Sequence, residues 1–165
     1  MWRVGWGREK GAVDVPAESV YAVFEVKPLA SRGEVAYAGE KVASVRALHR
    51  TSARLISGGV SRAAIEPRPI LGGFLAAGSV WSAETLGVNI RRALAENKGD
   101  RRIDLGCCLA HGSFETFENR RGARVSRAED SLIFFILRLL DRLQGMGTAP
   151  AADLMEYWRS VKLAR

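Results

Sequence analysis

Residues 20–27 are an apolar run in which polar and apolar positions alternate toward the end, a pattern that predicts a β-strand. Because successive side chains of a strand point to opposite faces, one face of this strand is wholly apolar. The other face begins with apolar residues and ends with Glu25 and Lys27, two positions apart and therefore on the same side. A lone charge in an apolar interior is costly, so the two must pair, bind a metal or reach water.

Helices are predicted where capping residues precede apolar residues at helical spacing. Residues 31–34 read Ser-Arg-Gly-Glu, a capping box, and begin the first helix, with Arg46 on its solvated side. The second helix is expected over about 82–96. Another capping box, Ser126–Glu129, precedes the most apolar helix, expected over 130–144.

Strands are expected to alternate with these helices. Residues 69–76 and 103–110 are apolar runs of strand length, so the layout is of the α/β class. A chain of 165 residues has the size of one domain and can bury roughly 70% of its unfolded surface. We expect an irregular N-terminal segment over 1–13 and one α/β domain over 14–165.

The Glu25-Val26-Lys27 segment resembles one half of the active-site motif of restriction-endonuclease-like nucleases, the PD-(D/E)XK superfamily. In that superfamily an upstream Asp and this Glu hold a divalent metal, and the Lys helps to activate the attacking water. The backbone carbonyl of the middle residue, here Val26, commonly joins the metal shell. The resemblance therefore implies Mg²⁺ or Mn²⁺ as cofactor, and hydrolysis of a phosphodiester as the reaction.

A wider match, over about 14–163, resembles an uncharacterised prokaryotic family of unknown function that lies near these nucleases. The segments that carry the likeness are 15–27, 40–46, 72–74 and 145–150. The likeness implies a restriction-endonuclease-like mixed sheet flanked by helices. Members of that family carry a helix and an Asp-bearing strand before this point, so we expect this fold to lack its first helix and strand.

Three acidic residues near the start of the chain are candidates for the missing Asp. In a tight hairpin centred near Ala17, Asp14 would lie roughly 17 Å from Glu25, too far to share a metal. Glu9 would face Glu25, but the glycines around it weaken a strand, and Glu18 lies in or beside the turn. Asp14 is kept as a candidate ligand, and the metal site is expected to be half complete.

The net charge of +7, from 25 basic and 18 acidic residues, favours an anionic partner, and we expect nucleic acid. Arg120, Arg121, Arg124 and Arg127 cluster in an expected loop and are candidate phosphate contacts. Arginine-rich chains also arise from genome composition, with the side chains simply solvated. Neither interpretation indicates a preferred nucleotide sequence.

Other classes of site are disfavoured. Cys107 and Cys108 are adjacent in an apolar run and are expected to be buried thiols, while His49 and His111 stand singly, so no zinc site is predicted. No apolar run approaches the ~20 residues that span a bilayer, and no secretion signal is apparent, so we expect a cytoplasmic protein without membrane contact.

These observations favour a truncated metal-dependent phosphodiesterase domain that is weakly active or inactive. One alternative is an active Mg²⁺-dependent DNA or RNA endonuclease, completed by an acid from the N-terminal segment or from a second subunit. The other is a non-catalytic module that binds nucleic acid or protein. Missing strands would leave the strand at 20–27 on a sheet edge, which favours a homo-oligomer.

Overall fold

The computed structural model describes residues 2–4, 13–15, 17, 20–50, 55–57, 60–62, 68–117 and 122–146. Its helices are α1 (Arg32–Arg46), α2 (Ala83–Glu96), α3 (Ser131–Met146) and the short 3-10 helix η2 (Gly99–Arg101). Its strands are β1 (Trp2–Val4), β2 (Val13–Val15), β3 (Ala22–Ala30), β4 (Leu55–Ser57), β5 (Val60–Arg62), β6 (Leu71–Ser79), β7 (Leu105–Cys108), β8 (Gly112–Glu115) and β9 (Arg124–Val125).

Five strands form a mixed sheet in the order β3-β6-β7-β8-β9. The first three run parallel, and β8 and β9 are antiparallel to their neighbours. Among the described strands β3 therefore lies at one edge of this sheet, with Glu25 opposite Phe74 and Lys27 opposite Ala76 on β6. The expected α/β class with a mixed sheet is confirmed.

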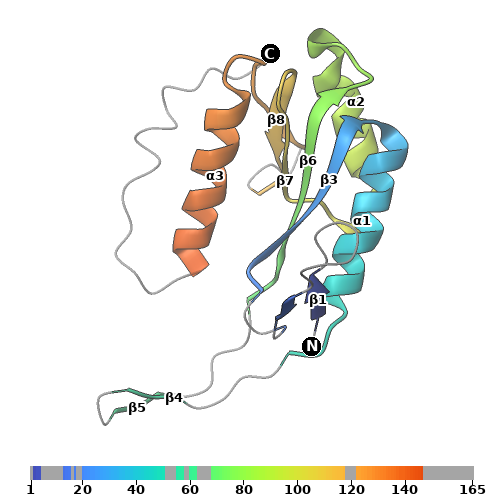
Figure 1. Cartoon of the computed structure of the whole chain (residues 1–165). Helices are drawn as coiled ribbons and strands as arrows, with labels where there is room; N and C mark the ends of the chain where they lie inside the picture. Colours follow the sequence, from blue (N-terminus) through green and yellow to red (C-terminus); the bar gives the residue numbers. More distant parts are fainter. Residues whose placement is uncertain are drawn as a thin grey trace.

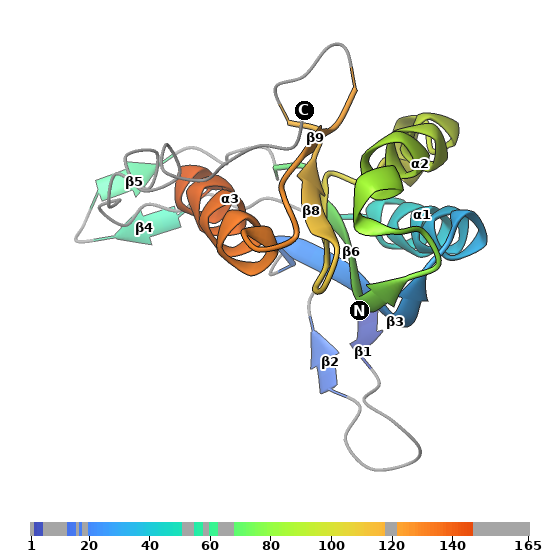
Figure 2. The same ribbon diagram turned by 90° about the horizontal axis from the view of Figure 1, so that it is seen from above.

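The sheet lies between two layers of helix, with α1 and α2 on one face and α3 on the other (Figures 1 and 2). The alternation of β3 divides its residues between two cores. Val23 packs into the core with α1 and α2, while Ala22 and Phe24 pack with Phe135 of α3. A side chain at Gly73 would collide with the Phe24 ring, so the bare backbone of β6 is what lets Phe24 lie against it.

Arg46, at the last residue of α1, ties the end of that helix to the sheet. Its guanidinium donates to the carbonyls of Ile70 at 2.9 Å, Asp100 at 2.9 Å and Arg102 at 2.7 Å. It also pairs with the carboxylate of Asp104, the residue before β7, at 2.6 Å. That carboxylate accepts the backbone N–H of Gly72 on β6. The prediction of a solvated Arg46 was wrong, because its acceptors come from segments distant in sequence.

Two other local predictions differ from the structure. The second capping box does not cap a helix: α3 begins at Ser131, and the Ser126 hydroxyl accepts the backbone N–H of Ser113 at 2.8 Å. Within the segment 1–13, the described residues 2–4 form β1, which pairs with β2. The hairpin near Ala17 is not formed either, since β2 pairs with β1 and β3 pairs with β6. The helix predictions at 31–34 and 82–96 are confirmed, with Ser31 as the N-cap of α1.

None of the helices in the described ranges has the length and apolar character needed to cross a membrane.

Replacing Arg46 with Ala should lower the free energy of unfolding by about 3 kcal/mol, because three carbonyls and a nearly buried carboxylate lose their donor. Arg32→Ala is the matched control, since its pair with Glu96 is exposed and should contribute less than about 1 kcal/mol. Urea titration measures both values. Equal unfolding midpoints for the two variants would contradict the anchoring role of Arg46.

Candidate functional site

Glu25 and Lys27 meet on the α1 face of the edge strand β3. The Lys27 Nζ lies 3.2 Å from Glu25 Oε1, and each side chain keeps about a quarter of its surface exposed (23% and 24%). The strand period places them on the same side, as the sequence predicts, and partial exposure leaves both in reach of a solute. Val26, between them, is 66% exposed.

Helix α1 supplies two further groups to Lys27. The Lys27 Nζ lies 3.1 Å from Glu34 Oε2 and 4.2 Å from the centroid of the Tyr37 ring. Lys41 lies over the same ring at 5.0 Å. The ammonium of Lys27 is thus held by two carboxylates from different elements and by an aromatic face.

Glu34 belongs to this site, although its sequence pattern indicates only a capping box. Ser31 Oγ does accept the Glu34 backbone N–H, at 3.3 Å, but the Glu34 carboxylate turns to Lys27. The available signal was the short connection: β3 ends at Ala30, and α1 begins at Arg32 with a first turn where an acidic side chain is favourable.

These contacts raise the pKa of Lys27 above its ordinary value. The hydrogen bond to Glu34 is the largest cause; partial burial opposes it, and the bond to Glu25 adds to it. Lys27 is therefore a protonated ammonium at neutral pH. Its chemistry here is that of a fixed positive charge that can stabilise an anion, rather than that of a base.

The donors around Lys27 suit a hard divalent cation. Mg²⁺ and Mn²⁺ prefer carboxylate oxygens, and Mg²⁺ is commonly held by one or two carboxylates together with water and substrate phosphate. Glu25 and Glu34 already share one cation, the Lys27 ammonium. Within the described ranges, however, no group of three or more His, Cys, Asp or Glu side chains is placed to hold a metal.

Of the three candidate replacements for the missing Asp, only Asp14 is among the described residues. Asp14 lies on β2, where its Cα is opposite that of Arg3 in a separate two-stranded sheet. This register differs from the hairpin used to estimate its distance from Glu25. Glu9 and Glu18 lie outside the described residues.

Two of the four clustered arginines, Arg124 and Arg127, lie in the described part of the chain. Arg120 and Arg121 lie outside the described residues, and Arg127 is exposed. Arg124 is on β9 rather than in a loop, and its guanidinium lies 3.5 Å from the buried carboxylate of Glu115. The charge of Arg124 therefore pairs with a carboxylate in the interior of the fold.

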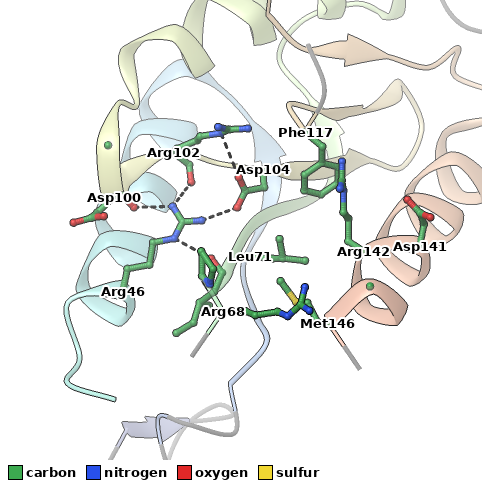
Figure 3. Close-up of a pocket in the computed structure, with 14 residues that line it drawn as sticks. Arg46, Arg68, Leu71, Asp100, Arg102, Asp104, Phe117, Asp141, Arg142 and Met146 are labelled. Atoms are coloured by element: carbon green, nitrogen blue, oxygen red, sulfur yellow. Dashed lines mark hydrogen bonds and ion pairs between the residues drawn. The ribbon is translucent and has the colours of Figure 1, made fainter. Parts of the chain in front are cut away.

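A separate cavity of about 680 Å³ lies at the starts of β6 and β7, between the ends of α1 and α3 (Figure 3). Its wall is rich in charge, but Arg46 is already engaged by Asp104. On the α3 side Arg142 stacks on Phe117, with its guanidinium carbon 4.2 Å from the ring centroid. The cavity is distinct from the Glu25–Lys27 pair, which lies farther along β3.

Comparison with known proteins identifies relatives of the chain, although no family model matches it. A protein from Pseudomonas aeruginosa named endodeoxyribonuclease NucC is 45% identical over 144 residues, which are 87% of this chain and 59% of that protein. The NucC endodeoxyribonuclease of Escherichia coli (strain MS 115-1) is 44% identical over 149 residues, with the same two shares of 87% and 59%. The chain is similar to NucC endodeoxyribonucleases.

Solved NucC structures agree with the fold. The cAAA-bound form of the P. aeruginosa protein has a TM-score of 0.75 at 42% identity, over 87% of this chain and 60% of that one. The cAAA-bound form of the E. coli protein has a TM-score of 0.78 at 39% identity, over 95% and 64%. The restriction-endonuclease-like fold expected from the sequence is confirmed by this likeness.

The NucC similarity also corrects one expectation. The relatives are named nucleases, whereas the expected resemblance was to an uncharacterised family of unknown function. The chain spans 59% of the length of these two NucC proteins.

Neither cysteine has the setting of a nucleophile. Cys107 and Cys108 are buried free thiols on β7; burial raises the pKa of Cys107, and it raises the pKa of Cys108 to about 12. Thiolate is therefore scarce at neutral pH.

In the folded chain both thiols should react with Ellman's reagent at pH 8 at least about 100-fold more slowly than in urea, because they are buried and protonated. The rate of absorbance change measures this. Fast labelling of one thiol in the folded protein would show that β7 is exposed.

Proposed function

We propose that this chain carries the catalytic core of a divalent-metal-dependent endodeoxyribonuclease. The observation that carries the proposal is the contact between Lys27 and Glu25 on the edge strand, in a chain similar to NucC endodeoxyribonucleases. DNA is the proposed substrate because the relatives are named for it, and the net charge of +7 favours a polyanion.

In this mechanism Glu25 would hold Mg²⁺ or Mn²⁺, with the Val26 carbonyl as a proposed further ligand. When bound, the metal supplies Lewis-acid chemistry at the phosphodiester and makes water a better nucleophile. Lys27 adds a fixed positive charge beside the reacting phosphate, where negative charge grows in the transition state. Partial exposure of Glu25 and Lys27 gives the DNA backbone access to both.

A further carboxylate is required by the proposal, because Glu34, the acidic residue that the structure places beside Glu25 and Lys27, is paired with Lys27. Asp14 stays a candidate, and so does an acid from a second copy of the chain. The edge position of β3 supports the second option, since an edge strand offers unpaired backbone groups to a partner.

We also infer that the chain binds cAAA, since two similar NucC structures are cAAA-bound forms. The cavity of Figure 3 supports this, because its volume of about 680 Å³ falls in the range of small-molecule sites. Arg142 and Phe117, which contact each other, are among the residues that line this cavity.

The nuclease proposal predicts that the full chain binds Mn²⁺ saturably and cleaves closed circular DNA when Mn²⁺ or Mg²⁺ is present. Glu25→Gln should weaken Mn²⁺ binding at least about 10-fold and cleavage at least about 100-fold, because it removes the carboxylate charge. Calorimetry and gel electrophoresis measure the two effects.

Glu40→Gln is the matched control: it is the same substitution on α1, at an exposed pair with Arg101, and should change neither value. DNA binding without saturable Mn²⁺ binding or cleavage would favour the alternative of a non-catalytic DNA-binding module.

The ligand proposal predicts that cAAA raises the melting temperature of the chain and that Arg142→Ala reduces this shift. Melting curves at increasing cAAA concentration measure it. Equal shifts in parent and variant would place the ligand elsewhere, and no shift in the parent would end this proposal.

A further inference from the structure

We propose that Glu34 and Tyr37 are positioning residues that hold the Lys27 ammonium in place when the Glu25 carboxylate turns to a metal. This inference rests on the proposed function. It adds two residues of α1 to a site that the strand motif alone would limit to β3.

The Lys27 ammonium contacts two carboxylates at once. Its Nζ lies 3.2 Å from Glu25 and 3.1 Å from Glu34, so either carboxylate alone keeps the ammonium paired. A divalent metal on Glu25 competes for that carboxylate and also repels the ammonium. Without a second anion, Lys27 would move toward solvent, away from the reacting phosphate.

The backbone of Glu34 is held at the start of α1. Ser31 Oγ accepts its backbone N–H, and the next residue, Val35, is fully buried in the core. The first turn of α1 is therefore fixed against the sheet. The Glu34 side chain extends from that turn to Lys27, while its backbone N–H donates to the Ser31 hydroxyl.

The Tyr37 ring restricts the direction of the Lys27 side chain. The Tyr37 ring lies one turn after Glu34, with its centroid 4.2 Å from the ammonium. An ammonium is attracted to the face of an aromatic ring, so the ring limits the positions that Lys27 can take. Glu34 and Tyr37 together define one place for the charge.

The test follows Lys27 directly by the nitrogen NMR order parameter of its side-chain Nζ, in the full chain without metal. Glu25→Gln imitates a carboxylate whose charge is no longer available to Lys27. In this variant the Nζ should stay as ordered as in the parent, whereas the order parameter should fall by at least half in the double variant with Glu34→Gln. Equal mobility in Glu25→Gln and the double variant would overturn the proposal.

Activity gives the second readout. Glu34→Gln should lower kcat for DNA cleavage at least about 10-fold and leave the Mn²⁺ affinity and KM within about twofold, because Glu25 is intact. Tyr37→Leu should also lower kcat, and Tyr37→Phe should restore it, because Phe keeps the ring. A changed KM with unchanged kcat, or equal kcat for Phe and Leu, would refute positioning.

The two readouts separate this inference from the nuclease proposal. If the parent neither binds Mn²⁺ nor cleaves DNA, the nuclease proposal fails, yet the order parameters still decide whether Glu34 holds Lys27. Glu40→Gln serves as control in both experiments, since Glu40 lies on α1 but pairs with Arg101.

Discussion

The ion pair between Arg46 and Asp104 is the constraint on which the geometry of the site depends. It joins the end of α1 to the starts of two sheet strands, because Asp104 also accepts the backbone N–H of Gly72 at 2.9 Å. The opposite end of α1 is capped beside the end of β3. A helix fixed at both ends presents its first turn to β3 in one position, and that turn carries Glu34.

A second polar contact fixes the position of α3 on the other face of the sheet. Arg138 on α3 and Glu115 on β8 are both 1% exposed and lie 2.9 Å apart. Removing one member would leave a charge in the interior, although the pair itself need not add net stability. Its physical effect is directional: an apolar helix such as α3 could slide or turn on an apolar sheet, but one buried pair selects a single register.

Much of the fold was predictable because its signals are local. The alternation of β3, the Ser31 cap and the spacing of α2 are set by neighbouring residues, and the structure agrees with each. The failures involve partners distant in sequence. The hydroxyl of Ser126 is taken by a backbone group 13 residues away, and Arg46 finds acceptors 24 to 58 residues away.

The candidate site divides in the same way. The contact between Glu25 and Lys27 follows from the strand period alone, whereas Glu34 had a sufficient local explanation as a capping residue. A capping pattern identifies which backbone group needs a partner, but it does not show that the acidic side chain is used there. Only the position of β3 beside α1 shows that this carboxylate reaches Lys27. The further carboxylate that the proposed metal site needs has no local signal in the sequence.

The short connection between β3 and α1 has a consequence for folding. Glu25 and Glu34 are nine positions apart in the chain, and Lys27 lies between them. Closing so short a loop costs little chain entropy, and loops of this length close within roughly 100 ns. The charged cluster can therefore form as soon as this one strand and helix dock, before the distant strands β8 and β9 complete the sheet.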